Sequence, residues 1–273
     1  MFFTLSGVAI RILSNSYLNV LQKILTLRGE KASVVNFYTY LGLSFIGLFI
    51  LFKFGLTITN ELLVIFFAMG LLGALGNYFI IKALSLGELS SLAPINSYKP
   101  IVALFISFFL LRELPSTISI IGIILIIFGT YFLFSVRGVN ANKKAIRYRI
   151  LALIFSGSEA VFIKKVLLLT NVPVSFALWA ISGFLFSTLF IVKSPIKISS
   201  IKYQLFLILI VCIMQYSTNF VFARMNVSSA LALFQLSTLF SVYLGANIFK
   251  EQHFIRKFLA SVIMVIGAVI IIL

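Results

Sequence analysis

The sequence predicts an all-α integral membrane protein whose ten transmembrane helices form two inverted five-helix repeats. Three observations predict this fold: an apolar composition, ten apolar segments of helical length, and an internal repeat. Of the 273 residues, 62% are hydrophobic and 10% are charged, and the mean hydropathy is +1.17. A water-soluble domain of this size needs a more polar surface. We therefore expect a multi-pass protein of the cell (inner) membrane, with the lipid bilayer as its surroundings.

Ten apolar segments are long enough to cross a membrane. A hydrocarbon core of about 30 Å takes about 20 helical residues to cross. The expected spans are roughly residues 3–26, 32–53, 61–85, 90–111, 116–135, 149–169, 173–193, 203–226, 228–249 and 254–273. They are too long for membrane strands and lack strict alternation, which argues against a barrel. The start, MFFTLSGVAI, has no basic region and no clear cleavage site, so we expect it to be a retained first span.

A shift of 138 residues aligns the two halves of the chain without a gap. It places Asn77-Tyr78 on Gln215-Tyr216, Ser90-Ser91 on Ser228-Ser229, Arg112-Glu113 on Lys250-Glu251, and Gly129 on Gly267. We expect one five-helix repeat over residues 1–135, a basic connecting loop over 136–148, and a second repeat over 149–273. Because each half crosses the membrane an odd number of times, the second half enters it inverted, as in many secondary transporters.

Most of the 22 Lys and Arg residues lie in loops or at the ends of the expected spans, with an uneven distribution. One side has 15: Lys23, Arg28, Lys31, Lys82, Arg137, Lys143, Lys144, Arg147, Arg149, Lys193, Lys197, Lys202, Lys250, Arg256 and Lys257. The other side has 5: Lys53, Arg112, Lys164, Lys165 and Arg224. The positive-inside rule makes the first side cytoplasmic. Both termini of a ten-span chain then face outward.

The residue inventory excludes several kinds of chemistry. The chain has a single cysteine, Cys212, a single histidine, His253, and six Glu but no Asp. Hydrolytic triads, metal clusters and intrachain disulfides cannot be assembled from this set, and no phosphate-binding P-loop is present. The net charge of +16 does not gather into a soluble basic face. We therefore expect no enzyme activity, cofactor, metal or nucleic acid, and the oligomeric state, including a homodimer, is left open.

The stretch INSYKP, residues 95–100, places a lysine deep in the fourth span. If that span begins near Ser90, Lys99 lies about 14 Å along the helix, close to the midplane. A lysine there costs on the order of 3 kcal/mol on insertion, so it should face a cavity or a partner. Pro100 should free the Asn96 carbonyl toward the same interior. The alternative is a lysine that snorkels or is neutralised by a structural glutamate.

Two further charges lie deep in the first and sixth spans. Arg11, Asn15, Asn19 and Gln22 follow one face of a single helix, which in a membrane must line the interior of the bundle. Glu159 lies about ten residues into its span, where a desolvated carboxylate can take up a proton and couple a gradient to transport. An ion pair of Glu159 with Arg11 or Lys99 is an equally open interpretation.

The repeat separates candidate functional residues from the scaffold. The 138-residue shift places Lys99 on Ser237 and Glu159 on Leu21, so neither has a charged equivalent; it places Arg11 on Arg149, at the start of the expected span. We expect Lys99 and Arg11 to favour a substrate with an anionic group. Secondary candidates for lining the cavity are Asn77, Tyr78, Gln215, Tyr216, Asn219, Gln235 and Thr238, for which hydrogen bonds between helices are an equal alternative. Gly70, Gly73, Gly76, Gly122, Gly129 and Gly267 indicate closely packed helix faces.

The final part of the first half, YFIIKALSLGELSSLAPINSYKPIVALFISFFLLRELPSTISIIGIILIIFGTYFLF, resembles an EamA repeat of the drug/metabolite transporter superfamily. The similar features are an Ala near the end of the third span, a Pro midway along the fourth, Glu at its end, and Gly-x(6)-Gly in the fifth. The second half resembles it more loosely, with Thr238 in place of Pro100 and Ala260 in place of Gly122. The resemblance implies export of amino acids, other metabolites or drugs. It also implies that both termini are cytoplasmic, which is opposite to the orientation given by the charge count. We favour the orientation given by the charge count.

The sequence thus predicts a secondary active transporter, most simply an exporter, of a small metabolite such as an amino acid or an organic anion. Alternating access about a midplane site, with proton coupling through Glu159, is the expected mechanism. One alternative is an exporter of drugs or lipophilic cations. An alternative of another class is a non-transporting membrane protein that handles lipids or assists assembly.

Overall fold

The chain folds into a bundle of long helices. The computed structural model describes residues 2–111, 118–134, 142–191 and 200–270, and these contain helices and no strand. The helices are α1 (Phe2–Leu27), α2 (Ala32–Phe54), α3 (Asn60–Leu84), α4 (Leu89–Leu92), the 3-10 helix η1 (Pro94–Tyr98), α5 (Lys99–Leu111), α6 (Ser119–Phe134), α7 (Lys143–Leu169), α8 (Val172–Ile191), α9 (Ile201–Phe222), α10 (Val227–Phe234), α11 (Leu236–Phe249) and α12 (Phe254–Ile270).

Six segments in this part of the chain are long and apolar enough to cross a membrane: 32–54, 60–84, 89–110, 172–191, 201–222 and 227–249. The multi-pass membrane character that the composition predicts is therefore confirmed. Helices α1 and α7 do not belong to this set although each exceeds 25 residues. Both helices carry several polar residues toward the inside of the bundle, which lowers their average hydropathy.

Two of the expected spans are broken in the middle. The fourth is divided into α4, η1 and α5, and the ninth into α10 and α11 on either side of Gln235. Pro94 at the start of η1, and not Pro100, lies at the first break. The Asn96 carbonyl is not free as predicted, because it accepts a hydrogen bond from the Lys99 backbone N–H. Pro100 lies in the first turn of α5, where its missing N–H disrupts no helical hydrogen bond.

Helix α7 begins six residues before the expected sixth span and takes up part of the predicted connecting loop. The side chain of Asn142 accepts a hydrogen bond from the backbone N–H of Lys144 at 2.9 Å, which caps the helix. The basic segment of residues 143–149 is therefore helical. As a result, Arg149 lies well inside the helix and is buried, with 3% of its surface exposed. The remainder of the connecting loop, and the start of the fifth span at 116, fall outside the described residues.

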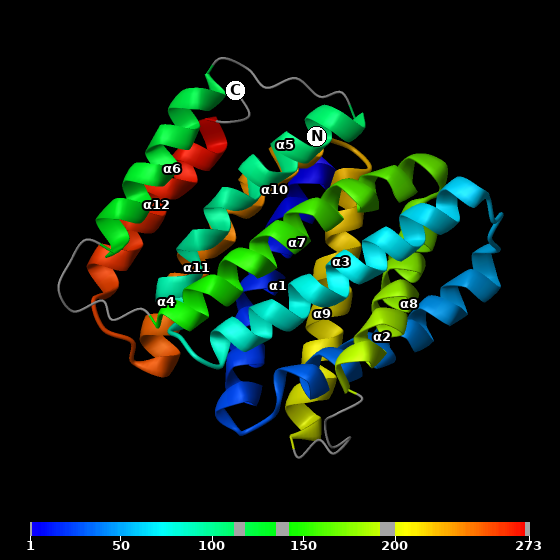
Figure 1. Ribbon diagram of the computed structural model, residues 1–273, viewed down its shortest axis with the longest axis horizontal. Helices are drawn as coiled ribbons and strands as arrows, with labels where there is room; N and C mark the ends of the chain where they lie inside the picture. Colours follow the sequence, from blue (N-terminus) through cyan, green and yellow to red (C-terminus); the bar gives the residue numbers. More distant parts are fainter. Residues whose placement is uncertain (1, 112–117, 135–141, 192–199, 271–273) are drawn as a thin grey trace.

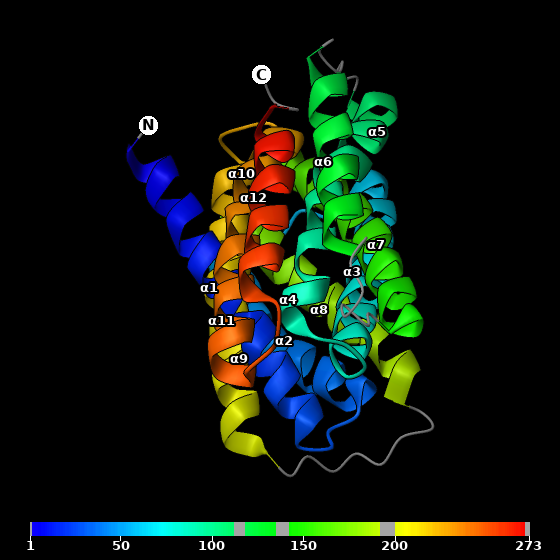
Figure 2. The ribbon, with the colours of Figure 1, turned by 90° about the vertical axis from the view of Figure 1, so that its left-hand side faces the viewer.

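The helices pack in pairs that join the first half of the chain to the second. Figure 1 shows α3 beside α7, α2 beside α8, and α6 beside α12, and α1 packs against α9. The first residues of α1 and the last of α12 lie at the same end of the bundle in Figures 1 and 2, as an even number of crossings requires.

Glycines of α3 and α6 allow the close approaches between helices that the sequence predicted. A Cβ on Gly70 would lie 2.5 Å from the Ser182 side chain in α8, and one on Gly76 would lie 3.2 Å from Ser156 in α7. A Cβ on Gly129 in α6 would lie 2.5 Å from Met264 of α12. A Cβ at Gly70 would also lie 2.7 Å from the backbone of Ser182, so a larger residue there would push α3 and α8 apart, whereas at Gly76 and Gly129 the facing residues would have to shift.

Candidate functional site

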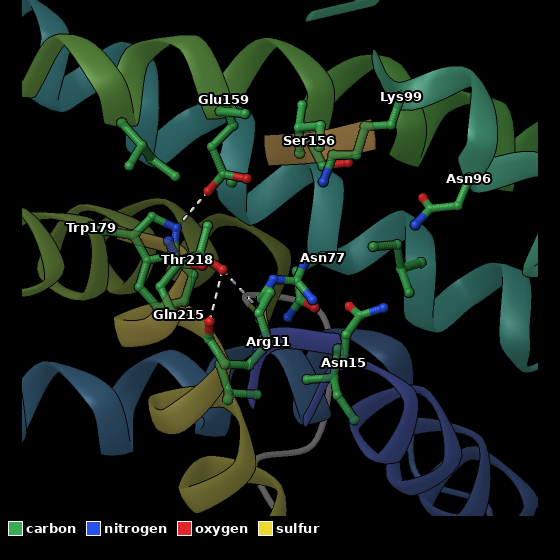
Figure 3. A pocket seen from close by; sticks show the side chains of 18 of the residues that line it. Arg11, Asn15, Asn77, Asn96, Lys99, Ser156, Glu159, Trp179, Gln215 and Thr218 are labelled. Atoms are coloured by element: carbon green, nitrogen blue, oxygen red, sulfur yellow. Dashed lines mark hydrogen bonds between the residues drawn. The ribbon is translucent and has the colours of Figure 1, made fainter. Parts of the chain in front are cut away.

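A polar cavity of about 90 Å³ lies in the middle of the bundle. A cavity of this size holds several water molecules or a small polar molecule. The residues around it come from both halves of the chain, chiefly from α1, α3, α7 and α9 (Figure 3). Eight of the residues singled out in the sequence line it: Arg11, Asn15, Asn19, Asn77, Asn96, Lys99, Glu159 and Gln215.

Arg11 is the most exceptional side chain in the cavity. Its surface is only 7% exposed, yet Nε and one terminal guanidinium nitrogen have no hydrogen-bond partner within the protein. Its guanidinium carbon lies 4.9 Å from the centre of the Phe234 ring, a cation–π contact. Figure 3 shows the guanidinium directed into the cavity between Gln215 and Asn77. Buried donors without partners are costly, and an anionic ligand would supply the missing acceptors.

Two more cations line the same cavity. Lys99 extends into it from the start of α5 (Figure 3). Arg149 enters from α7 and donates from Nε to the backbone carbonyl of Leu92 at 3.2 Å. The cavity therefore combines three cationic side chains with one carboxylate, that of Glu159, and an anionic group would balance the excess positive charge.

Glu159 lines the cavity from α7, the helix that also carries Arg149, and lies near an aromatic cluster. Its Oε1 atom accepts a hydrogen bond from Trp179 Nε1 at 2.5 Å (Figure 3). The ring of Tyr40 lies 5.2 Å from that of Trp179. No ion pair of 4.0 Å or less joins Glu159 to Arg11 or Lys99 within the described residues. The structural ion pair considered from the sequence is therefore absent from this conformation.

The remaining amides connect α1 to the helices around it. Asn15 donates to the Ser237 hydroxyl at 2.9 Å. Ser237, which the 138-residue shift aligns with Lys99, therefore contacts the polar face of α1 that carries Arg11 and Asn15. Gln22 donates to Asn77 at 2.9 Å, and Asn77 donates to Asn36 at 2.7 Å. This chain of hydrogen bonds fixes the Asn77 amide at the cavity wall, whereas Gln22 lies beyond it.

Five predicted lining residues lie outside the cavity. Tyr78 follows Asn77 by one residue, a rotation of about 100° around the helix, and stacks on Phe190 at 4.8 Å. Tyr216 follows Gln215 in the same way and is 41% exposed on the outer surface. Asn219 packs against Gln215 and Ser175. Gln235 donates to the Leu231 carbonyl at the break between α10 and α11, and Thr238 is buried nearby without lining the cavity.

Sequence reasoning missed Arg149, Trp179 and Tyr40 as lining residues. The 138-residue shift did align Arg149 with Arg11, but the expected helix start placed it at the membrane surface. Trp179 is the single tryptophan of the chain, and nothing in its local sequence sets it apart from a core residue. Contacts between distant segments place it beside Glu159.

Gly73 makes room for the Glu159 carboxylate, and we expect Gly73→Ala to displace it. A Cβ at Gly73 would overlap Oε1 of Glu159 and lie 3.3 Å from the Tyr40 hydroxyl. Overpacking of this kind costs about 1–3 kcal/mol, so the melting temperature should fall. The emission of Trp179 should shift because its hydrogen bond to Glu159 is disturbed.

Gly129→Ala is the matched control, because its Cβ would contact Met264 far from the cavity. It should lower the melting temperature without changing the tryptophan emission. Unchanged emission in Gly73→Ala would contradict the steric coupling between Gly73 and Glu159.

Comparison with known proteins gives a family match for residues 4–135 and a fold for the whole chain. The model of the EamA-like transporter family matches residues 4–135. No curated protein matches the chain. One similar solved structure, described only as the crystal structure of a protein, covers 99% of this chain and 96% of its own length, with a TM-score of 0.69 and 15% sequence identity. At this identity the likeness establishes a shared fold over the whole length.

Proposed function

Because residues 4–135 of this membrane transporter are an EamA-like unit, we propose that it moves a small metabolite with an anionic group by alternating access. The observation that carries the proposal is the buried Arg11 guanidinium, whose unpartnered nitrogens lie on a central cavity. Three cations around one small cavity favour an organic anion or the carboxylate of an amino acid. Export is the direction that the family resemblance favours.

Inverted repeats are the architecture we propose for the two halves. Five pairs of cavity-lining residues are related by the 138-residue shift: Arg11 and Arg149, Leu18 and Ser156, Gly73 and Val211, Asn77 and Gln215, and Ile80 and Thr218. The helix contacts follow the same relation, because α1 packs on α9 as its counterpart α7 packs on α3. A site on the pseudo-symmetry axis is reached equally from either face when the halves rock.

Glu159 is the proton-coupling residue in this proposal. It is the only carboxylate among the lining residues of the cavity, and its partner in the other half is Leu21, so symmetry of the scaffold does not require it. The carboxylate can exchange a proton with water when the cavity is open to one face of the membrane. It loses contact with that water when the cavity closes. Export of lipophilic cations remains the second candidate, and the excess of three cations over one carboxylate disfavours it.

A cell (inner) membrane location with both termini outside is the topology we propose from the charge count. A reporter fused after Leu273 should then be active only on the outer face, while one inserted in the 137–149 region should be active in the cytoplasm. Cytoplasmic activity of the C-terminal fusion would show that the orientation implied by the EamA resemblance applies instead.

A ligand screen tests the proposed function directly. Purified protein is screened for thermal stabilisation by amino acids, organic acids, sugar phosphates and cationic dyes, because a ligand that binds the folded state raises the melting temperature. We expect stabilisation by a small anion or amino acid and its loss in Arg11→Gln. Stabilisation by cationic dyes alone would favour export of lipophilic cations. Each stabilising compound must also be transported by the protein reconstituted into vesicles.

A further inference from the structure

A cluster of four charged side chains closes the end of the bundle opposite the first residues of α1 and the last of α12. We refer to Lys23, Glu88, Glu251 and Lys257 as the end cluster. Lys23 Nζ lies 2.7 Å from Glu251 Oε1, and Lys257 Nζ lies 2.5 Å from Glu88 Oε2. The side chains of Lys23, Glu251 and Lys257 are exposed by 9%, 4% and 1%, whereas that of Glu88 is 48% exposed. Three of the four charges are therefore largely withdrawn from solvent.

The end cluster holds the start of the broken fourth span. Glu251 accepts hydrogen bonds from the backbone N–H groups of Leu89 at 2.8 Å and Ser90 at 2.7 Å. Lys23 donates to the Gly87 carbonyl at 2.9 Å, and Lys257 donates to the Ser90 hydroxyl at 2.9 Å. Residues 87–90 are thus fastened on one side to α1 and on the other to the α11–α12 connection and α12.

The Lys23 to Glu251 pair joins a residue of the first half to one of the second half. Burial by itself would raise the pKa of Glu251, but the charge of Lys23 and hydrogen bonds from Lys23 and Ser90 hold it below its ordinary value. Glu251 therefore stays charged at neutral pH, and the pair does not release by protonation. Separation of the two halves at this end must break a formed, partly buried ion pair.

The opposite end of the bundle offers a lysine for comparison. Lys164 of α7 donates to the backbone carbonyls of Phe222 at 2.6 Å and Met225 at 3.4 Å. Met225 is 138 residues from Gly87, the residue whose carbonyl Lys23 binds. Each lysine thus ties the first helix of its own half to the end of the third helix of that half or the turn after it.

We propose that Lys23 and Glu251, with Lys257 and Glu88, form the gate that closes the central cavity toward this face of the membrane. The inference rests on the proposed alternating access, and the structure is then a state closed at this face, with Leu89, Ser90, Ser91 and Leu92 buried beneath the gate. Opening requires residues 87–90 to separate from α1 and from the α11–α12 connection. Both ion pairs break in this step and form again when the face closes.

Thiol labelling tests the gate without any need for transport. Ile80 lines the cavity and lies about one turn from the end of α3 at this face, so Ile80→Cys in a Cys212→Ser background reports access. A membrane-impermeant thiol reagent is added on the face that carries Lys257. We expect slow labelling of the parent and labelling about tenfold faster or more in Glu251→Gln, because loss of a charge-assisted pair shifts the population toward the open state.

Lys164→Met is the matched control in the same background. It removes a lysine of similar geometry at the other end and should not speed labelling from this face. Equal acceleration in both variants would indicate general loosening of the bundle and would overturn the gate. The gate would also be overturned if neither Glu251→Gln nor Lys257→Met changed the labelling rate.

A reversible cross-link provides the second test. Lys23→Cys and Glu251→Cys are bridged by a bifunctional disulfide-forming reagent in the Cys212→Ser background and later released by reductant. We expect the bridge to reduce transport by at least about tenfold, reductant to restore it, and ligand binding to persist. A bridged protein that transports normally would overturn the gate. If the parent transports no tested compound, the proposed substrate class fails, while the labelling result still decides the gate.

Discussion

Glu159→Gln should abolish accumulation of substrate against a gradient while leaving substrate binding largely intact. The carboxylate lies on the central cavity and accepts a hydrogen bond from Trp179. A glutamine oxygen can accept the same bond, so the local packing is retained while the exchangeable proton is lost. Transport that remains in the variant should be downhill and insensitive to pH. The measurement is uptake into proteoliposomes with and without an imposed proton gradient, together with ligand binding.

Glu61→Gln is the control for this experiment. Glu61 is exposed at the start of α3, and its substitution should leave both accumulation and pH dependence unchanged. A Glu159→Gln protein whose transport kept its full pH dependence would exclude Glu159 as the coupling site.

Lys99→Ala is expected to weaken binding of the native substrate by about 10- to 150-fold. This range corresponds to roughly 1.5–3 kcal/mol for charge-assisted hydrogen bonds to an anionic group. The melting temperature should change little, because removing a buried cation without an ion-pair partner also removes its desolvation cost. The ion pairs of 4.0 Å or less in the described part of the chain involve Lys23 and Lys257, and not Lys99.

The Lys99 experiment measures binding and melting temperature on the same sample. Lys202→Ala, an exposed lysine in the first turn of α9, is the control and should change neither. If Lys99 instead supported Glu159 structurally, its loss would strand a buried carboxylate and destabilise the protein by several kcal/mol. Intact affinity with a large drop in melting temperature would therefore contradict the substrate-site assignment.

The positions of the helices could be predicted closely from the sequence. Apolar segments of about 20 residues need the bilayer and must satisfy their backbone hydrogen bonds within themselves, so composition and length are enough. The prediction failed at the start of α7, where a charged segment, residues 143–148, continues the helix beyond the apolar region. Hydropathy locates the apolar part of a span, whereas the capping hydrogen bond of Asn142 marks where helix α7 starts.

Part of the candidate site was also accessible from the sequence. Polar residues deep in apolar spans are costly unless they face the interior, and this reasoning identified Arg11, Lys99 and Glu159 as lining one cavity. It could not separate Asn77 from Tyr78 or Gln215 from Tyr216, because the rotation of a helix about its axis depends on its neighbours. The first member of each pair lines the cavity, whereas Tyr78 stacks on Phe190 and Tyr216 is exposed on the outer surface.

The sequence by itself determined the all-helical membrane class, the approximate spans and the buried charges, since each depends only on local transfer free energies along the chain. The tertiary structure alone decided which charges meet. It placed Arg149 on the same cavity as Arg11, paired Glu159 with Trp179 instead of with a cation, and joined Lys23 to Glu251 across 228 residues. These contacts depend on how helices from the two halves pack and rotate against one another, and that packing is a property of the whole bundle.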